Sequence, residues 1–256
     1  MPSRAERRRQ QRQLRPTKKL PPQSNEPVLD VIVYVAPPTP PSDAWACIAS
    51  LPPDRRTLTL CSFAPLADPT EPIAGWCRPV LGQHDAVERV RLAVSRQRAP
   101  FILFVNATCR LQEPTMVDLA LAHLAAGGAV VGALLAQDDV VSAAGYAFGT
   151  RGPYPRFVGW SVKNERVQQA GPLQAVPLHF LMTSRKVWTA LDGLRPHFQD
   201  RPYADADYCI RAGRGQGGTL YEPAIVVHCP PLPAADPRAV ELLMAVQPVY
   251  DEWQTL

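Results

Sequence analysis

The chain has 256 residues, of which 46% are hydrophobic and 20% charged, the composition of a globular protein with one large or two small domains. Residues 1–19 hold eight Lys or Arg and one Glu, a net charge of +7, whereas the whole chain carries only +4. Residues 20–256 therefore carry a net charge of −3, which argues against a folded body that binds nucleic acid.

The basic segment at the start, MPSRAERRRQQRQLRPTKK, has no apolar run and so does not read as a secretory signal. We expect residues 1–27 to form a disordered arm and linker. The alternatives are a transit peptide and a tether to a polyanion through residues 1–19. No segment reaches the roughly 18 apolar residues of a membrane span. The six cysteines form no Cys-x-x-Cys pair, so we expect free thiols and a cytoplasmic protein.

Strand and helix patterns alternate along the rest of the chain. The first strand, VLDVIVYV, is apolar throughout, as strands inside parallel sheets are. In chain order, strands are predicted at residues 28–35, 57–62, 77–81, 101–105, 129–135, 178–182 and 220–228. Helices are predicted at residues 42–50, 85–98, 114–126, 184–191, 202–214 and 236–250. Residues 145–160, rich in Gly and aromatics, are predicted to form a loop that either stacks on a sugar or is pinned to the core.

This alternation predicts an α/β fold with a mostly parallel central sheet flanked by helices. Right-handed crossovers place the carboxyl ends of parallel strands at one edge, where open α/β sheets bind their ligands. We therefore expect the functional residues to follow the ends of the predicted strands.

The segment from residue 177 to residue 228 carries a series of motifs in a fixed order. They are an apolar strand and its helix, the turn Asp192-Gly193-Leu194-Arg195, the acidic motif Ala204-Asp205-Ala206-Asp207, Arg211, and a strand from Pro223 to His228. This order resembles the second half of a family 2 glycosyltransferase. The resemblance covers residues 28–230 and implies the glycosyltransferase A-type fold, in which a nucleotide-binding half is joined to an acceptor-binding half. Residues 231–256 would then be a C-terminal extension with a helix.

The resemblance implies that Asp205 is the catalytic base, which takes the proton from the acceptor hydroxyl as it attacks the anomeric carbon. We expect Asp205 near the start of a helix whose first turn contains Pro202, where a carboxylate is stabilised. The structural alternative is that Asp205 only satisfies this helix end. Asp207 lies about 200° further around the helix, so we expect it to pair with Arg211 at i+4. Arg211 is also a predicted donor-binding residue.

The segment Asn106-Ala107-Thr108 stands where the resemblance places an Asp-x-Asp motif, whose carboxylates hold a divalent metal on the donor's diphosphate. Asn106 and Thr108 are the predicted donor-binding residues, but both are neutral, so we expect weak or lost dependence on Mn²⁺ or Mg²⁺. His228 either completes a metal site or is a partly buried, hydrogen-bonded histidine. Without a metal, the cation that neutralises the diphosphate would be one of four residues, Arg110, Lys163, Arg166 or Arg214.

We therefore predict a glycosyltransferase that moves a sugar from a nucleotide-diphospho-sugar donor to a hydroxyl of a glycan or other acceptor, with inversion. The alternative is a catalytically inactive glycosyltransferase-like module, used for binding or structure and tethered by the basic arm. A third hypothesis, a nucleic-acid-associated protein, has only the arm in its favour.

Overall fold

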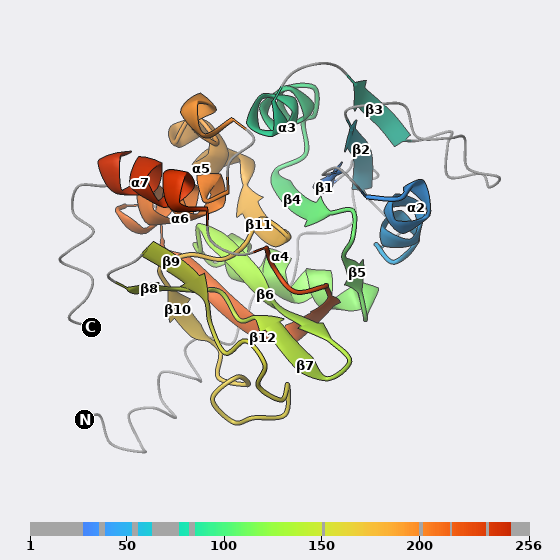
Figure 1. The fold of residues 1–256 in the computed structure, drawn as a ribbon. Coiled ribbons are helices and arrows are strands. Elements are labelled where there is room, and N and C mark those ends of the chain that lie inside the picture. The colour runs from blue at the N-terminus through green and yellow to red at the C-terminus, as the bar shows by residue number, and fades with distance from the viewer. Residues whose placement is uncertain are drawn as a thin grey trace.

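A ten-stranded sheet lies between two layers of helices (Figure 1). The computed structural model describes residues 28–35, 39–52, 56–62, 77–81, 85–149, 152–199, 202–215, 217–233 and 236–246, so the predicted arm, residues 1–27, lies outside the described residues. In these ranges no helix is both long and apolar enough to cross a membrane.

Eight strands follow one path across the sheet, in the order β10-β12-β6-β11-β4-β1-β2-β3. Their bounds are β1 (Leu29–Tyr34), β2 (Arg56–Ser62), β3 (Cys77–Leu81), β4 (Phe101–Asn106), β6 (Val130–Gln137), β10 (Gly171–Leu173), β11 (Phe180–Ser184) and β12 (Thr219–His228). Two short strands lie off this path, β5 (Arg110–Leu111) beside β12 and β7 (Val140–Ala143) beside β6. A separate two-stranded ribbon is formed by β8 (Tyr146–Gly149) and β9 (Gly152–Pro155).

The sheet is mixed but mostly parallel, which confirms the predicted fold class. Strands β3, β2, β1 and β4 are parallel neighbours, and β6 and β12 form a second parallel pair. Strand β11 runs antiparallel to both β4 and β6 and joins these two blocks. Its reversed direction pairs its first residue, Phe180, with Val105 near the end of β4. The start of β11 therefore lies at the same edge as the carboxyl ends of the parallel strands.

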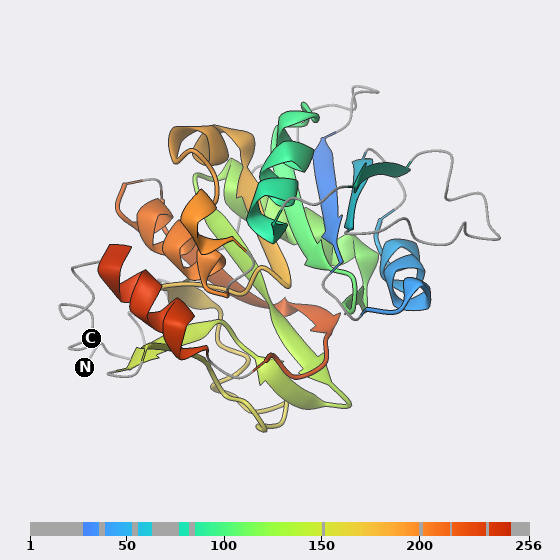
Figure 2. The ribbon, with the colours of Figure 1, turned by 45° about the horizontal axis from the view of Figure 1, so that its top comes forward.

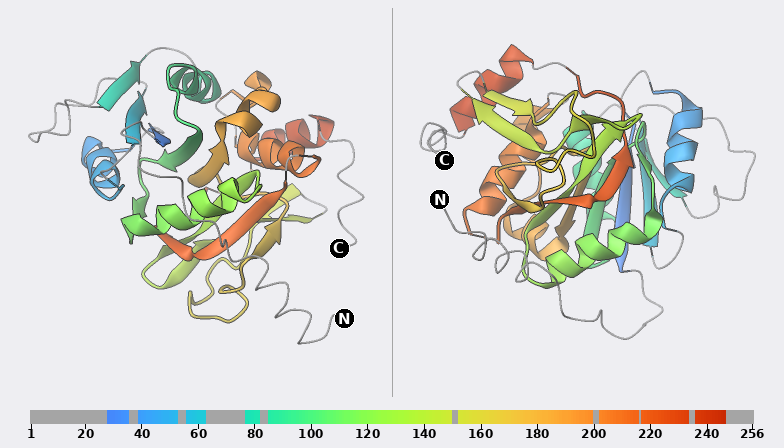
Figure 3. Two further views of the ribbon diagram at one scale, coloured as in Figure 1. Left: turned by 180° about the vertical axis from the view of Figure 1, so that it is seen from behind. Right: turned by 90° about the horizontal axis from the view of Figure 1, so that it is seen from below.

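Helices cover both faces of the sheet (Figures 1 and 3). One face packs on α2 (Pro41–Ala49) and α4 (Val117–Ala125), with the 3-10 turn η2 (Pro114–Met116) leading into α4. The other packs on α3 (Ala86–Ser95), α5 (Arg185–Ala190), α6 (Ala204–Gly213) and α7 (Pro237–Val246), with the 3-10 turn η3 (Pro196–Phe198) between α5 and α6. In β1, Val31 and Val33 face the first layer and Ile32 faces the second, and all three are fully buried. Burial on both faces explains why this strand is apolar throughout.

The structure corrects two predictions of local structure and tests a third only in part. The predicted loop at residues 145–160 contains the ribbon β8–β9 in its first part (Figure 2). The helix predicted at residues 202–214 begins only at Ala204, because Tyr203 has a φ of 75°, outside helical geometry. The helix predicted at residues 236–250 is α7 as far as Val246, and residues 247–250 lie outside the described residues. Strands β5, β7 and β10 have no counterpart in the sequence prediction.

Candidate active site

The predicted donor-binding turn closes on itself at the end of β4. Asn106 is the last residue of β4 and is buried. Its Oδ1 accepts hydrogen bonds from the backbone N–H of Thr108 at 2.9 Å and from the Thr108 hydroxyl at 2.8 Å. The backbone N–H of Ala107 donates to the carbonyl of Tyr34 at 2.9 Å, at the end of β1. The turn thus joins the carboxyl ends of two parallel neighbours, the edge where open α/β sheets bind ligands.

This turn does not offer the ligands of a divalent metal. Asn106 and Thr108 are neutral, and the two lone pairs of Asn106 Oδ1 are already engaged by Thr108. His228 ends β12, is partly exposed, and lies opposite Arg110 in the β5–β12 ladder. Across the described ranges, no three His, Cys, Asp or Glu side chains come together in a way that could hold a metal ion. The described residues therefore do not fit a tightly held Mn²⁺ or Mg²⁺.

Asp205 is a buried carboxylate in the first turn of α6, with an exposed fraction of 7%. Its Oδ2 accepts a hydrogen bond from the backbone N–H of Leu178 at 2.7 Å, and its Oδ1 accepts one from the backbone N–H of Ala206 at 2.8 Å. Burial raises the pKa of Asp205 to about 6, against the opposing effect of these N–H groups and of the Tyr146 hydroxyl. A carboxyl group with this pKa is largely ionised at neutral pH and remains a better base than an ordinary aspartate.

One short segment connects Asp205 to the donor-binding turn. Leu178 donates its backbone N–H to Asp205, and the next residue, His179, accepts a hydrogen bond at its carbonyl from the backbone N–H of Asn106 at 3.2 Å. This segment immediately precedes β11, whose reversed direction delivers it to the edge where β4 ends. The predicted base and the predicted donor-binding turn therefore lie in one neighbourhood, although they are about a hundred positions apart in the sequence.

Aromatic residues complete this neighbourhood; of these, the sequence singles out only Tyr146, as part of the aromatic segment 145–160. The ring of His179 meets that of Tyr34 edge-on, with 6.3 Å between centroids. Burial lowers the pKa of His179 to about 4, and its Nδ1 has no hydrogen-bond partner among the described residues. The rings of Tyr146 and Tyr203 meet edge-on at 6.0 Å, and proximity to Asp205 raises the pKa of each beyond the effect of burial. The rings of Tyr146 and Tyr203 therefore lie close to Asp205 and help to bury its carboxylate.

The start of α6 differs from the expected arrangement. Pro202 lies before the helix rather than in its first turn, because Tyr203 takes a left-handed conformation with a φ of 75°. The Tyr203 carbonyl still accepts the backbone N–H of Asp207 at 3.0 Å, and its side chain packs on the β8–β9 ribbon, where its hydroxyl lies 3.4 Å from the carbonyl of Pro153. A left-handed tyrosine costs backbone energy. The left-handed conformation of Tyr203 also turns the chain into α6, so that Asp205 lies in the first turn of this helix.

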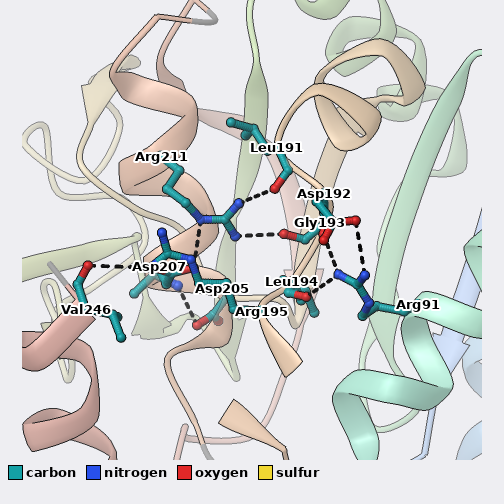
Figure 4. Close-up of polar contacts among 11 residues, drawn as sticks. Arg91, Leu191, Asp192, Gly193, Leu194, Arg195, Asp205, Asp207, Arg211 and Val246 are labelled. Atoms are coloured by element: carbon teal, nitrogen blue, oxygen red, sulfur yellow. Dashed lines mark hydrogen bonds and ion pairs between the residues drawn. The ribbon is translucent and has the colours of Figure 1, made fainter. Parts of the chain in front are cut away.

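Asp207 faces the other side of α6 and pairs with Arg211, as predicted (Figure 4). Its Oδ2 lies 2.8 Å from Nε of Arg211, and its Oδ1 lies 3.1 Å from a terminal nitrogen of Arg195. Asp207 is 0% exposed, so this is a buried pair rather than a surface one. Arg211 also donates to the carbonyls of Leu191 at 2.6 Å and Gly193 at 2.7 Å. Arg211 therefore ties α6 to the turn after α5.

That turn requires glycine at Gly193. Gly193 has a φ of 62°, and a Cβ placed on it would lie 2.5 Å from the indole of Trp188. Its neighbour Asp192 also has a positive φ, of 54°, and forms an exposed ion pair with Arg91 at 3.1 Å. Arg91 further donates to the carbonyls of Asp192 and Leu194, so α3 holds the same turn from the opposite side (Figure 4).

The aromatic residues of the segment 145–160 differ in burial. Tyr146 is buried beside Asp205, which places it in the core of the candidate site. Tyr154 and Trp160 are among the exposed large hydrophobic residues of the described chain. The ring centroids of Trp160 and Phe157 lie 4.9 Å apart. The guanidinium carbon of Arg156 lies over the Phe157 ring, 4.8 Å from its centroid.

Solved structures share this fold. The chain matches GalNAc-T7 bound to UDP, GalNAc and Mn²⁺ with a TM-score of 0.65 and 12% identity, over 88% of this chain and 50% of that one. It matches the mannosyltransferase PcManGT from Pyrobaculum calidifontis, bound to GDP-Man and Mn²⁺, with a TM-score of 0.57 and 12% identity, over 96% and 69%. It also matches residues 1–349 of S. aureus TarS with a TM-score of 0.54 and 12% identity, over 87% and 64%.

The chain therefore has the glycosyltransferase A-type fold that the resemblance implies. It spans about half the length of the GalNAc-T7 chain that it matches. No model of a known protein family matches the chain, and no curated protein sequence matches it.

Proposed function

We propose that the chain is an inverting glycosyltransferase that moves a sugar from a nucleotide-diphospho-sugar donor to a hydroxyl of a glycan or other acceptor, with weak or no dependence on a metal. The observation that carries this proposal is the buried Asp205 carboxylate, whose pKa of about 6 suits a general base, beside the turn at Asn106. The bound UDP and GDP-Man of the similar structures support a nucleotide-linked donor. Cys47, Cys109, Cys209 and Cys229 are buried free thiols, which is consistent with the proposed cytoplasmic location.

Asp205 can serve as the base if an acceptor hydroxyl takes the place of one of its donors. Its carboxylate accepts the backbone N–H groups of Leu178 and Ala206 and also a hydrogen bond from the Tyr146 hydroxyl, and we propose that the acceptor hydroxyl replaces the Tyr146 hydroxyl. In the proposed step the hydroxyl oxygen attacks the anomeric carbon, its proton passes to Asp205, and the bond from that carbon to the diphosphate oxygen breaks. The electron pair of the broken bond leaves with the nucleoside diphosphate. A single displacement of this kind inverts the anomeric carbon and requires only one carboxylate.

The remaining site residues are assigned by their position. Asn106 and Thr108 lie at the edge where β4 ends, so we propose that their polar groups contact the donor. The sequence predicts donor contact for Arg211 as well. Because its guanidinium is bound to Asp207 and to two carbonyls, we propose that Arg211 acts on the donor only through the position of the Gly193 turn.

The test is turnover of a panel of UDP-, GDP- and dTDP-sugars, followed as release of the nucleoside diphosphate with and without glycan acceptors. Asp205→Asn should lower turnover about a hundred-fold or more, because the amide keeps the shape but cannot take the proton. Asp192→Asn is the matched control, since its carboxylate is 88% exposed in the nearby turn, and it should keep full activity. Turnover that survives Asp205→Asn would refute the role of Asp205.

The second candidate function is an inactive glycosyltransferase-like module. It is favoured by the donor turn, in which Asn106 and Thr108 satisfy each other in place of two carboxylates. A protein that binds nucleoside diphosphates but consumes no nucleotide sugar in this panel, at any pH between 5 and 9, would support the module over the enzyme.

A further inference from the structure

We propose that Arg110 supplies the positive charge that binds the diphosphate of a nucleotide ligand, in the place that a divalent metal would otherwise take. This inference rests on the proposed function and deepens it, because it names the residue that makes nucleotide binding independent of metal. Four cations are candidates from the sequence, and the strand register selects one of them.

Arg110 lies directly beside the donor-binding turn. It is the first residue of β5 and follows Thr108 by two positions. In the antiparallel β5–β12 ladder, Arg110 stands opposite His228. Directly opposed residues of an antiparallel pair lie on the same face, with Cβ atoms about 5 Å apart. The ladder thus puts a guanidinium and an imidazole side by side where the turn at Asn106 ends.

The guanidinium of Arg110 also reaches toward the ligand edge of the sheet. One of its terminal nitrogens lies 3.1 Å from Oδ1 of Asp43, in the first turn of α2. Helix α2 follows β1, so its first turn lies at the carboxyl ends of the parallel strands. The side chains of Arg110 and Asp43 are 44% and 35% exposed, and exposed pairs of this kind are weak. A diphosphate can therefore compete with Asp43 for the five N–H groups of Arg110.

The other arginines near the candidate site are already engaged. Arg211 and Arg195 bind Asp207, and Arg91 binds Asp192 together with carbonyls of the same turn. Lys163 and Arg166 belong to a loop whose backbone is fastened to the β6–β7 turn, through Val162 N–H and the carbonyl of Asp139. Arg214 is the C-cap of α6, at the opposite end of that helix from Asp205. The ladder places none of these three residues next to Thr108.

A fixed arginine can do the electrostatic work of a metal on a leaving diphosphate. The guanidinium is permanently charged and offers paired N–H groups that match two phosphate oxygens. It needs no carboxylate ligands, which agrees with the neutral Asn106 and Thr108. In this proposal Arg110 takes over the role of the metal. The turn then no longer needs the two carboxylates that would hold a metal, and neutral Asn106 and Thr108 stand in their place.

The experiment is calorimetric titration of the full chain with UDP, GDP, ADP and dTDP, first in EDTA and then with Mn²⁺. At least one nucleotide should bind in EDTA, and Mn²⁺ should not strengthen its binding. Arg110→Gln should raise its Kd about tenfold or more, since a hydrogen bond to a charged group is lost. Arg98→Gln is the matched control, because Arg98 is exposed just before β4 begins, at the opposite edge of the sheet, and its Kd should stay unchanged.

A second variant tests the competition with Asp43. Asp43→Asn should tighten nucleotide binding several-fold, because it releases Arg110 from its ion pair. In the Arg110→Gln background the same change should have no effect, whereas a general effect of removing a negative charge would persist there.

The possible outcomes separate this inference from the proposed function. Binding in EDTA that weakens in Arg110→Gln, but not in Arg98→Gln, supports Arg110 as the diphosphate ligand. Binding that Arg110→Gln leaves unchanged overturns this inference while the proposed function stands. Binding that requires Mn²⁺ overturns this inference and the metal independence of the proposed function, while the proposed sugar transfer stands. Failure of every nucleotide to bind in either condition, together with no turnover of any donor, overturns the proposed function and this inference with it.

Discussion

Removal of the Asp207 carboxylate should destabilise the protein far more than removal of the Asp192 carboxylate, although both pair with arginines that hold the same turn. Asp207→Ala leaves Arg211, whose side chain is only 10% exposed, as a buried charge without its carboxylate. It also removes the partner of Arg195, which is 35% exposed. Breaking a buried ion pair on one side costs about 3–5 kcal/mol, and most of this cost should come from Arg211. Because whole domains are stable by only about 5–15 kcal/mol, the loss should be large.

The control is Asp192, which also pairs with an arginine but is exposed instead of buried. In the Arg91–Asp192 pair the side chains are 29% and 88% exposed, so Asp192→Ala should cost less than about 1 kcal/mol. Urea unfolding followed by circular dichroism measures both variants, and the slope of the free energy against urea should stay constant while the midpoint shifts. A double variant, Asp207→Ala with Arg211→Met, should recover part of the loss, because no unpaired charge remains at that position. Equal losses in the two single variants would refute the reasoning that burial decides the cost.

The remaining predictions concern the base and the glycine turn. Turnover should rise with pH through about 6 as Asp205 ionises, and Tyr146→Phe should move this rise to higher pH, because the Tyr146 hydroxyl lowers the pKa of Asp205. The folded pKa of Asp205 lies above its ordinary value of 3.8, so Asp205 contributes stability near pH 4 that is lost as the pH rises through about 6, up to about 3 kcal/mol; urea midpoints of the unmodified protein and of Asp205→Asn should show this difference in pH dependence. Gly193→Ala should destabilise by about 2–4 kcal/mol, from its positive φ and the contact with Trp188, whereas Gly213→Ala, with open space around its Cβ, should be neutral or slightly stabilising by thermal melting.

Strand β1 could be predicted from the sequence because it is buried on both faces. The run of Val31, Ile32 and Val33 predicts β1, because a strand that is buried on both faces is apolar at every position. Strands β5, β7 and β10 have four residues or fewer, too short for any period to show. The direction of β11 could not be predicted either, since side-chain pattern is the same for parallel and antiparallel neighbours. Its reversal depends on contacts with Val105 and Val131 that are distant in sequence.

The candidate site likewise has features that the sequence predicts and features that it does not. The pairing of Asp207 with Arg211 follows from helix geometry alone, and the structure confirms it. The supports of Asp205 come from Leu178 and Tyr146, which approach from other elements and carry no local signal. His179 stands just before β11 in the sequence, and only the fold shows that it is buried against Tyr34. Local rules therefore predict pairs within one helix, whereas the surroundings of the base depend on tertiary packing.

The place of β11 in the sheet has a consequence for how the protein is made. Strands β4 and β6 are synthesised well before β11, yet they are not neighbours, because β11 lies between them. Until residue 184 has left the ribosome, the facing edges of both strands have unpaired backbone groups on either side of an open slot. Exposed edges of this kind pair with other chains and promote aggregation. Insertion of β11 pairs these two facing edges and brings the loop at Leu178 to the place where Asp205 will dock. The other edge of β6 stays unpaired until β12 has been made, so the risk of self-association falls in two steps along the chain.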